Sequence, residues 1–285
     1  MTSRRIYILI GLAFLALAAL LRFWIAPYLE HLPAYYSSET DYTNENQIRD
    51  SPAGDWTTES LVSKRIDQAI STNANALIIE GGLHVYHTDG SVNFETIALY
   101  GVDRRTRMNV PDLGDTSRNG QFLFPLHVQQ SSYVYWDPIY IGPRTATFDH
   151  FEQIDGLKID VFHFIAENLD ETKGFDYLPD VPERYRAITK GQGILWIEPV
   201  SGIVVDYEDQ GSTSFVDSGT GQAVAELSSW DERYTPETRV AQLALARAAR
   251  LRILALEVWL PGGLVLVSLL FLGLFLYQRK KSSGD

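Results

Sequence analysis

The chain of 285 residues contains no cysteine, which excludes disulfide bridges, thiolate zinc sites and a cysteine nucleophile. It also lacks a Gly-x-Ser-x-Gly elbow, a His-Glu-x-x-His pair, a phosphate-binding loop and a dinucleotide-binding fingerprint. The six histidines are scattered, and the closest pair, His84 and His87, lies in a strand-like run where positions three apart face opposite sides. We therefore predict no enzyme activity, no catalytic residue, no metal site and no cofactor.

Positive charge is scarce in the middle of the chain. The chain has 24 basic and 36 acidic residues, of which nine basic and two acidic residues lie in the terminal segments. The stretch Tyr28 to Ala246 therefore keeps 15 basic and 34 acidic residues, a net charge of −19. Such a body repels phosphate backbones, so nucleic acid is excluded as a partner. The acids Asp206, Glu208, Asp209 and Asp217 lack the regular spacing of a calcium loop and are interpreted as solvated loop acids.

The mean hydropathy of −0.09 conceals a long apolar run near each end. Ile6–Ala26 is broken only by Arg22, and Val258–Tyr277 carries no charge and is followed by a basic cluster. As a helix, each run would be about 30 Å long, which matches the hydrocarbon core of a bilayer. A cleavable signal peptide with its site at Ala16–Ala18 is the alternative for the first run. The apolar sequence continues past that site and favours an uncleaved anchor.

Two spans place both termini on the same side of the membrane, and the basic residues outside the spans favour the cytoplasm for that side. The predicted divisions are a cytoplasmic N-terminus (1–5), transmembrane helix 1 (6–26), an extracytoplasmic β-rich domain (27–235), a juxtamembrane helix (236–257), transmembrane helix 2 (258–277) and a cytoplasmic basic tail (278–285). The cell membrane is the predicted location, and the lipid bilayer is the first predicted partner.

The middle of the chain has the pattern of antiparallel sheet, and we predict a mainly β (α+β) fold. Strand-like runs follow a polar segment, residues 28–65: 76–80, 83–88, 92–100, 122–124, 133–135, 146–151, 158–166, 193–198 and 203–210. Asp89-Gly90 between two of them is a hairpin turn signal. Thr235-Pro236-Glu237 predicts the start of a helix that continues over 238–256.

Several short blocks of the middle resemble the signature blocks of the bacterial PorA porin family. They are Val102–Thr106, Phe124–Leu126, Tyr133–Asp137, Ile154–Leu157 followed by Phe162–Phe164, and Trp196–Gly202, with Ser201 where the family usually has threonine. Their order and the two flanking spans also match, so the resemblance covers nearly the whole chain. The candidate motif positions are Asp103, Arg104, Arg105, Phe124, Pro125, Tyr135, Trp136, Asp137, Gly156, Glu198, Pro199 and Gly202.

The resemblance implies a pore, whereas the residues favour other functions. A porin barrel needs many strands of about ten residues with an apolar face toward lipid, and these runs are short and acidic. A pore formed by oligomerised spans would lack a polar stripe, because Ser268 is the only hydroxyl in the core of the second span and the core of the first span has none. Each motif block also has an ordinary structural interpretation: Asp103–Thr106 as a turn capped by Asp103, Glu198–Gly202 as a hairpin turn, and the aromatic blocks as sheet edges and core.

We therefore predict a membrane-anchored ligand- or partner-binding module of the cell envelope. The layout is similar to that of class B scavenger receptors, which implies a lipid as ligand, and an envelope polymer is the other candidate ligand. A PorA-like pore and a structural envelope protein remain the alternatives. The sequence leaves open whether the protein forms a homo-oligomer.

Overall fold

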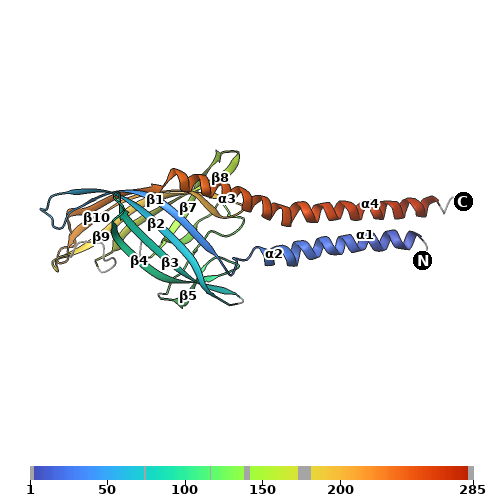
Figure 1. Cartoon of the computed structure of the whole chain (residues 1–285), viewed down its shortest axis with the longest axis horizontal. Helices are drawn as coiled ribbons and strands as arrows, with labels where there is room; N and C mark the ends of the chain where they lie inside the picture. Colours follow the sequence, from blue (N-terminus) through green and yellow to red (C-terminus); the bar gives the residue numbers. More distant parts are fainter. Residues whose placement is uncertain (1–2, 74, 116, 138–141, 173–180, 282–285) are drawn as a thin grey trace. The chain divides into compact units, whose positions relative to one another are not determined.

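The computed structural model describes the chain except for residues 1–2, 74, 116, 138–141, 173–180 and 282–285 (Figure 1). It contains two compact units. The first, the helical unit, combines Met1–His31 with Arg247–Asp285, and the second, the β unit, is Leu32–Ala246. The two units are described separately.

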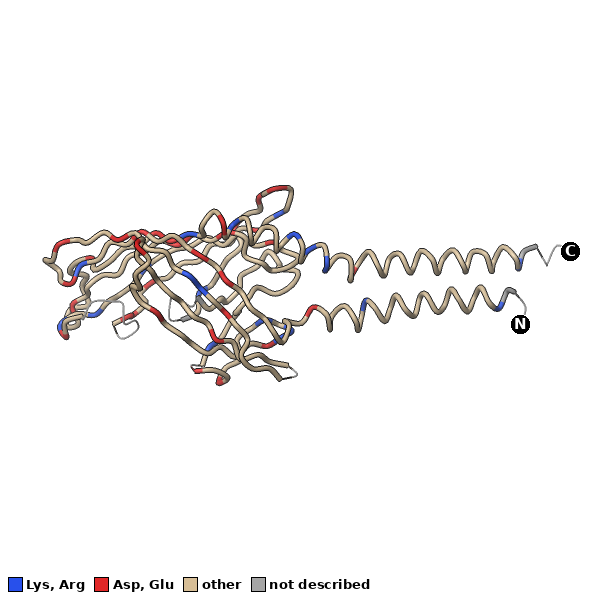
Figure 2. Tube along the Cα trace, in the orientation of Figure 1, with Lys and Arg blue, Asp and Glu red and all other residues tan. Residues whose placement is uncertain are grey.

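The helical unit consists of two long helical stretches. The first comprises α1 (Ser3–Leu20), the π-helical turn η1 (Leu21–Ile25) and α2 (Ala26–Leu29). The second comprises α3 (Pro236–Leu254), which begins in the β unit, then η2 (Ala255–Trp259) and α4 (Leu260–Lys281). Both stretches, Arg5–Leu29 and Pro236–Arg279, are long and apolar enough to cross a membrane. Figure 2 shows charges crowded over the β unit and almost none along α1 and α4.

Helices α1 and α4 pack against each other through small and aromatic residues. The Ser268 hydroxyl donates a hydrogen bond of 2.7 Å to the Gly11 carbonyl, and a Cβ atom on Gly11 would lie 3.0 Å from Leu272 Cγ. The Phe271 ring lies 6.1 Å from the Phe14 ring in a stacked arrangement. The one hydroxyl noted in the second span is therefore used between the two helices of the same chain.

The β unit is one antiparallel sheet in the strand order β5-β4-β3-β2-β1-β11-β10-β9-β8-β7-β6. Its strands are β1 (Ser37–Ile48), β2 (Thr57–Thr72), β3 (Ala76–His87), β4 (Val92–Asp103), β5 (Asn109–Gly114), β6 (Tyr133–Asp137), β7 (Gly142–Ile154), β8 (Leu157–Asp170), β9 (Tyr185–Glu198), β10 (Ile203–Asp217) and β11 (Ala223–Tyr234). Neighbours along the chain are neighbours in the sheet, apart from β1 beside β11 and the unpaired edges β5 and β6.

The two edges of this sheet are joined by the short segment Gly120–Phe122. The Asn109 amide donates to the Gly120 carbonyl at 2.8 Å, and the Phe122 amide donates to the Arg107 carbonyl at 3.1 Å. On the other side the Gln121 amide donates to the Val134 carbonyl at 2.7 Å. Unpaired strand edges are templates for aggregation, and this segment covers both of them. The sheet is therefore closed on itself and has an interior.

The predicted antiparallel, mainly β fold is confirmed, and several of its details were wrong. The polar segment 28–65 contains β1 and most of β2, β11 was not predicted, and residues 122–124, at and just after the end of the closing segment, lie outside any strand. Many strands have 12 to 16 residues, so the argument from strand length against a barrel does not hold. The β1 sequence SSETDYTNENQI contains one aliphatic residue, which is why hydrophobic patterning missed it.

Side chains on the inner face form the main core. Ring stacking and edge contacts connect Phe124, Tyr135, Phe162 and Phe164, and a second aromatic group contains Tyr42, Tyr207 and Tyr234. Another cluster fills the β3–β4 side with Leu77, Ile79, Tyr100, Val102 and Phe122. Because aromatic pairs are directional as well as apolar, this core fixes the positions of the strands around it.

Helix α3 covers part of the outer face of the sheet. Its residues Leu243 and Ala246 pack against Ile159 and Val205, which explains why β8 is buried on both faces over part of its length. The Thr235 hydroxyl accepts a hydrogen bond of 3.1 Å from the Thr238 amide, so the predicted helix start is confirmed. The Asp89-Gly90 hairpin is also confirmed, with Gly90 at φ +85° between β3 and β4.

The acids interpreted as solvated loop acids lie in strand β10, and three of them are buried. Asp206 accepts from Arg239 Nε of α3 at 2.8 Å, and Asp217 accepts from Arg184 Nε at 2.9 Å. Asp209 accepts from the indole nitrogen of Trp230 at 3.3 Å. That interpretation was wrong, because sequence spacing does not show which acids find partners inside a closed sheet.

Candidate ligand-binding site

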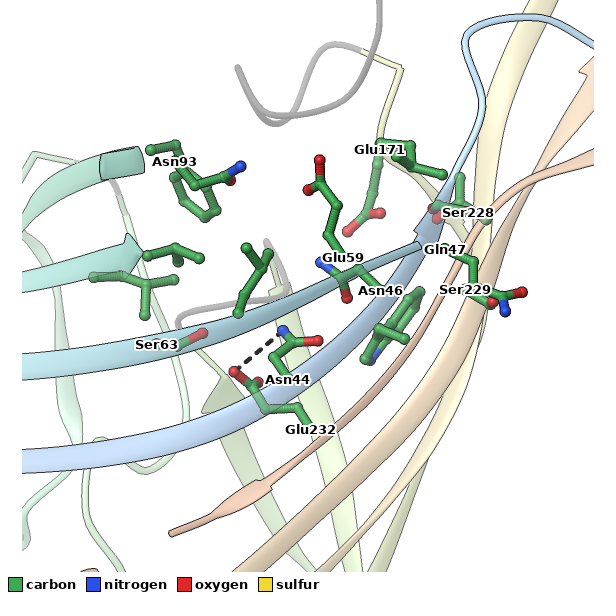
Figure 3. Close-up of a pocket in the computed structure, with 17 residues that line it drawn as sticks. Asn44, Asn46, Gln47, Glu59, Ser63, Asn93, Glu171, Ser228, Ser229 and Glu232 are labelled. Atoms are coloured by element: carbon green, nitrogen blue, oxygen red, sulfur yellow. Dashed lines mark hydrogen bonds between the residues drawn. The ribbon is translucent and has the colours of Figure 1, made fainter. Parts of the chain in front are cut away.

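A cavity of about 270 Å³ opens inside the sheet, between β1, β2, β3, β4, β10 and β11 (Figure 3). On β1 and β2, its lining residues come from the second half of β1 and the first half of β2. The chain enters the sheet at Ser37 and leaves it at Tyr234, at the opposite end of these strands. Ligand pockets in proteins commonly measure about 300–1,000 Å³, so this cavity lies just below that range and has room only for a small molecule.

One wall of the cavity is apolar. Leu61, Leu83 and Val85 are buried side chains of β2 and β3, and Phe94 of β4 packs against them. Val85 lies opposite Phe94 on one side and Ser63 on the other. Leu83 is two positions from Val85, and Leu61 is two positions from Ser63, so all four apolar side chains lie on the same inner face. This wall offers a surface for an alkyl or aromatic group.

The facing wall is polar and acidic. Asn44 and Asn46 of β1 and Glu232 of β11 line it, together with Glu59 of β2 and Glu171. Asn44 Nδ2 donates to Glu232 Oε1 at 3.5 Å. Within the described part of the chain, the side-chain oxygens of Asn44 and Asn46 are buried and accept no hydrogen bond. Buried polar atoms are nearly always satisfied, so these two oxygens indicate a site for a donor.

Glu171 reaches the cavity from the residue after β8. Its carboxylate accepts a hydrogen bond from Thr189, whose hydroxyl also lies 2.7 Å from that of Thr213. Burial raises the pKa of Glu171, and the bond from Thr189 and the charge of Arg144 oppose this shift. A nearby positive charge would favour the ionised form of this carboxyl group.

The position of Trp230 in the cavity wall depends on a glycine. Trp230 lies opposite Gly211 in the β10–β11 pair, and a Cβ atom on Gly211 would be 2.4 Å from the indole ring. The hydrogen bond from the indole nitrogen to Asp209 fixes the ring from the other side. An isolated glycine inside a strand often marks such a close approach, and this was the one sequence signal that could have indicated the cavity.

The predicted motif positions lie mainly elsewhere, and several meet where residues 124–128, just after the closing segment, approach the β9–β10 turn. Asp103 caps the β4–β5 turn by accepting from the amides of Arg105 at 2.9 Å and Thr106 at 2.7 Å. Arg104 Nε donates to the Leu32 carbonyl at 2.8 Å. The Arg105 side chain is exposed.

The β9–β10 turn is held by Glu198 and by Arg107. Glu198 is fully buried and accepts from the Ser201 amide at 2.8 Å. Arg107 Nη1 donates to the Ser201 carbonyl at 2.7 Å and to the Phe124 carbonyl at 3.2 Å. The Pro199 carbonyl accepts from the Val128 amide at 2.7 Å. The structure thus brings together five motif positions: Phe124, Pro125, Glu198, Pro199 and Gly202. Arg107, which connects the two segments, was not among the residues predicted from the sequence.

The remaining motif positions are separate. The Tyr135 ring stacks on Phe124 with centroids 5.8 Å apart, and the Trp136 ring lies 5.8 Å from the Arg118 guanidinium. Gly156 lies alone in the β7–β8 turn at φ +78°. Asp137 ends β6, and its side chain lies outside the described part. None of the motif residues whose side chains are described lines the cavity.

A group of exposed side chains that are distant in sequence meets on β7 and β8. Asp149 lies 2.8 Å from His150 Nδ1 and 3.3 Å from His163 Nε2, and Glu152 lies 3.1 Å from His150 Nε2. The hydrogen bonds that the His150 ring donates to Asp149 and, with a smaller effect, to Glu152 raise the pKa of His150. Among the described residues, no group of three or more histidines and acids, this one included, is suited to hold a metal ion.

Two likenesses to solved structures are weak. OccK2 (OpdF) of Pseudomonas aeruginosa, solved with glucuronate, is 13% identical with a TM-score of 0.20, covering 70% of this chain and 61% of its own. A DUF1329 family protein of Desulfovibrio piger ATCC 29098 is 6% identical with a TM-score of 0.20, covering 79% of this chain and 90% of its own. The chain thus spans about three fifths of the length of the first. At these TM-scores neither likeness supports a fold or function.

No curated protein matches the chain significantly. A sequence profile described as "Porin PorA" matches residues 5–277, which includes both apolar helices and the whole sheet. The match spans all of the motif blocks and agrees with the two membrane-compatible helices. This chain is a membrane protein and belongs to the Porin PorA family.

Proposed function

We propose that this chain is a ligand-binding protein of the cell envelope, in which the closed sheet holds a small molecule and the two helices anchor it in the membrane. The observation that carries the proposal is the interior cavity, with one apolar wall, one polar wall and two buried amide oxygens without a hydrogen bond among the described residues. Small-molecule sites typically combine such an apolar lining with a few convergent polar groups. The proposal includes no catalytic step.

The proposed topology is two-pass, with a cytoplasmic N-terminus (1–5), transmembrane helices 6–26 and 258–277, an extracytoplasmic domain (27–235), a juxtamembrane helix (236–257) and a cytoplasmic tail (278–285). Two apolar helices support the spans. Because β1 and β11 are antiparallel neighbours, both connections to the helices leave the sheet at the same end. Basic residues at the two termini support the cytoplasmic side for both.

The absence of cysteine allows a direct test of this topology. We expect Ser91→Cys, in the β3–β4 turn, to react with a membrane-impermeant maleimide in intact cells, whereas Ser3→Cys reacts only after lysis. The reason is that the reagent reaches only residues outside the permeability barrier. The cysteine-free parent chain is the control for background labelling. Labelling of Ser3→Cys but not of Ser91→Cys in intact cells would contradict the proposed orientation.

The ligand cavity itself is tested with hexan-1-ol, a neutral probe with an apolar chain. We expect calorimetric titration of the full chain in detergent to detect binding, and Val85→Trp to abolish it, since the larger side chain fills the space between the walls. Val92→Trp is the matched control, because Val92 is exposed at the start of β4. Ser228→Leu, a smaller change in the same lining, serves if Val85→Trp does not fold. Equal binding by the blocked and control variants would reject the cavity as the site.

The family name favours a pore as the second candidate. The outer face of the sheet does not suit lipid, since Glu39 and Glu45 of β1 point outward and are exposed, and charges on a lipid-facing strand are costly. A pore would therefore have to be formed by helices from several copies of the chain. Steady conductance of the purified protein in planar bilayers would favour this candidate over the anchored binding protein.

A further inference from the structure

We propose, resting on the ligand cavity above, that its ligand is a small amphiphile with an ammonium head group and an apolar tail. Among the described residues, 17 line the cavity; they include Glu59, Glu171 and Glu232, and none of them is a lysine or an arginine. A site whose described lining has three carboxyl groups and no basic side chain attracts a cation and repels an anion. The net charge of −19 over Tyr28–Ala246 also attracts a cationic ligand, and repels an anionic one, as the ligand approaches the cavity.

Glu59 is the carboxylate best placed to receive the head group. It lies on the inner face of β2 opposite Asn46 of β1, and Figure 3 shows its side chain extending into the space beside Glu171. Among the described residues, Glu59 has no hydrogen-bond or ion-pair partner within bonding distance. Among these residues, the Glu59 carboxylate is therefore available to a ligand, whereas the Glu171 carboxylate accepts a hydrogen bond from Thr189.

The acceptors around Glu59 match the donors of an ammonium group. A primary ammonium carries three N–H donors and no acceptor. The buried amide oxygens of Asn44 and Asn46 need donors, and Glu59 supplies the opposite charge. A carboxylate or phosphate head group would instead bring further acceptors to a wall that already has too few donors.

The rest of the cavity suits the two ends of such a molecule. The wall of Leu61, Leu83, Val85 and Phe94 provides a dry surface for an alkyl tail. The Trp230 ring, held by Asp209, lines the same space, and tryptophan is the best aromatic partner for a cation. The same geometry argues against fatty acids and anionic lipids as occupants.

The test uses three probes that share one tail: hexylamine, hexan-1-ol and sodium hexanoate. Calorimetric titration of the full chain in detergent at pH 7 should show hexylamine binding about tenfold more tightly than hexan-1-ol, the gain expected of a charge-assisted hydrogen bond. Hexanoate should bind more weakly than the alcohol. Glu59→Gln should remove the advantage of the amine over the alcohol.

Glu45→Gln is the matched control, since Glu45 lies on the outer face of β1 and the substitution changes the net charge equally. Amine binding that Glu59→Gln leaves intact, or that Glu45→Gln reduces equally, would overturn the assignment of the head-group site. Hexanoate or hexan-1-ol binding as tightly as hexylamine would overturn the ammonium class and leave the ligand cavity standing. Absence of binding by all three probes would instead contradict the proposed function.

Discussion

Asp67→Ala is expected to lower the free energy of unfolding of the β unit by about 3–5 kcal/mol, the loss typical when one partner of a buried ion pair is removed. Asp67 Oδ2 lies 2.9 Å from Arg65 Nε, and both side chains point inward from β2. The Asp67 side chain is 6% exposed and that of Arg65 is 16% exposed. Without Asp67, the guanidinium, which lies over the Phe122 ring at 5.7 Å, would keep its charge in a nearly dry interior.

Urea unfolding followed by tryptophan fluorescence measures this loss. Glu80→Ala is the control, because Glu80 is an exposed acid on the outer face of β3, and such substitutions change stability by about 0.5 kcal/mol or less. The double variant Arg65→Met with Asp67→Leu should recover most of the stability, since it leaves no unpaired charge. A single variant as stable as the Glu80→Ala control would show that the pair does not hold the interior together.

The second large effect is expected at the β9–β10 turn, where Gly202→Ala should lower the free energy of unfolding by about 3 kcal/mol or more. Gly202 has φ +71°, a conformation that costs an L-residue about 1–2 kcal/mol. A Cβ atom there would also lie 2.3 Å from the Pro125 carbonyl oxygen and 2.5 Å from that of Phe124. These oxygens belong to the segment that Arg107 binds, so relief of the clash would separate that segment from the turn.

Gly156→Ala separates the cost of the positive φ from the cost of the steric clash. Gly156 has nearly the same backbone conformation, φ +78°, but a Cβ atom there meets nothing within 4 Å. It should therefore show only the conformational cost of about 1–2 kcal/mol in the same urea experiment. Equal losses for the two alanine variants would show that the contact between the turn and Pro125 contributes nothing to stability.

The strands that the sequence predicted best are those with apolar side chains on at least one face. The run 158–166 lies within β8, where Phe162 and Phe164 face the aromatic core and Ile159 faces α3. Strand β1 was missed for the opposite reason. Its inward positions Asn44 and Asn46 line the cavity, so they need no apolar side chain.

The motif blocks show how much of a site short patterns can reveal. The turn at Asp103 and the hairpin turn at Glu198–Gly202 were predicted from residue types, and the structure confirms both. Their meeting through Arg107 depends on contacts between residues about 90 positions apart, which local spacing does not encode. The cavity was missed because it is formed by six strands from both ends of the sequence.

The sequence by itself determined the two membrane-compatible helices, the acidic middle, the antiparallel class and the family. Long apolar runs, net charge and turn residues are local properties, so a linear pattern records them. Only the tertiary structure decided that the sheet closes through Gly120–Phe122, that buried acids of β10 have partners, and that an acidic cavity lies inside. These features arise when distant strands pair, because pairing register determines which side chains share the interior.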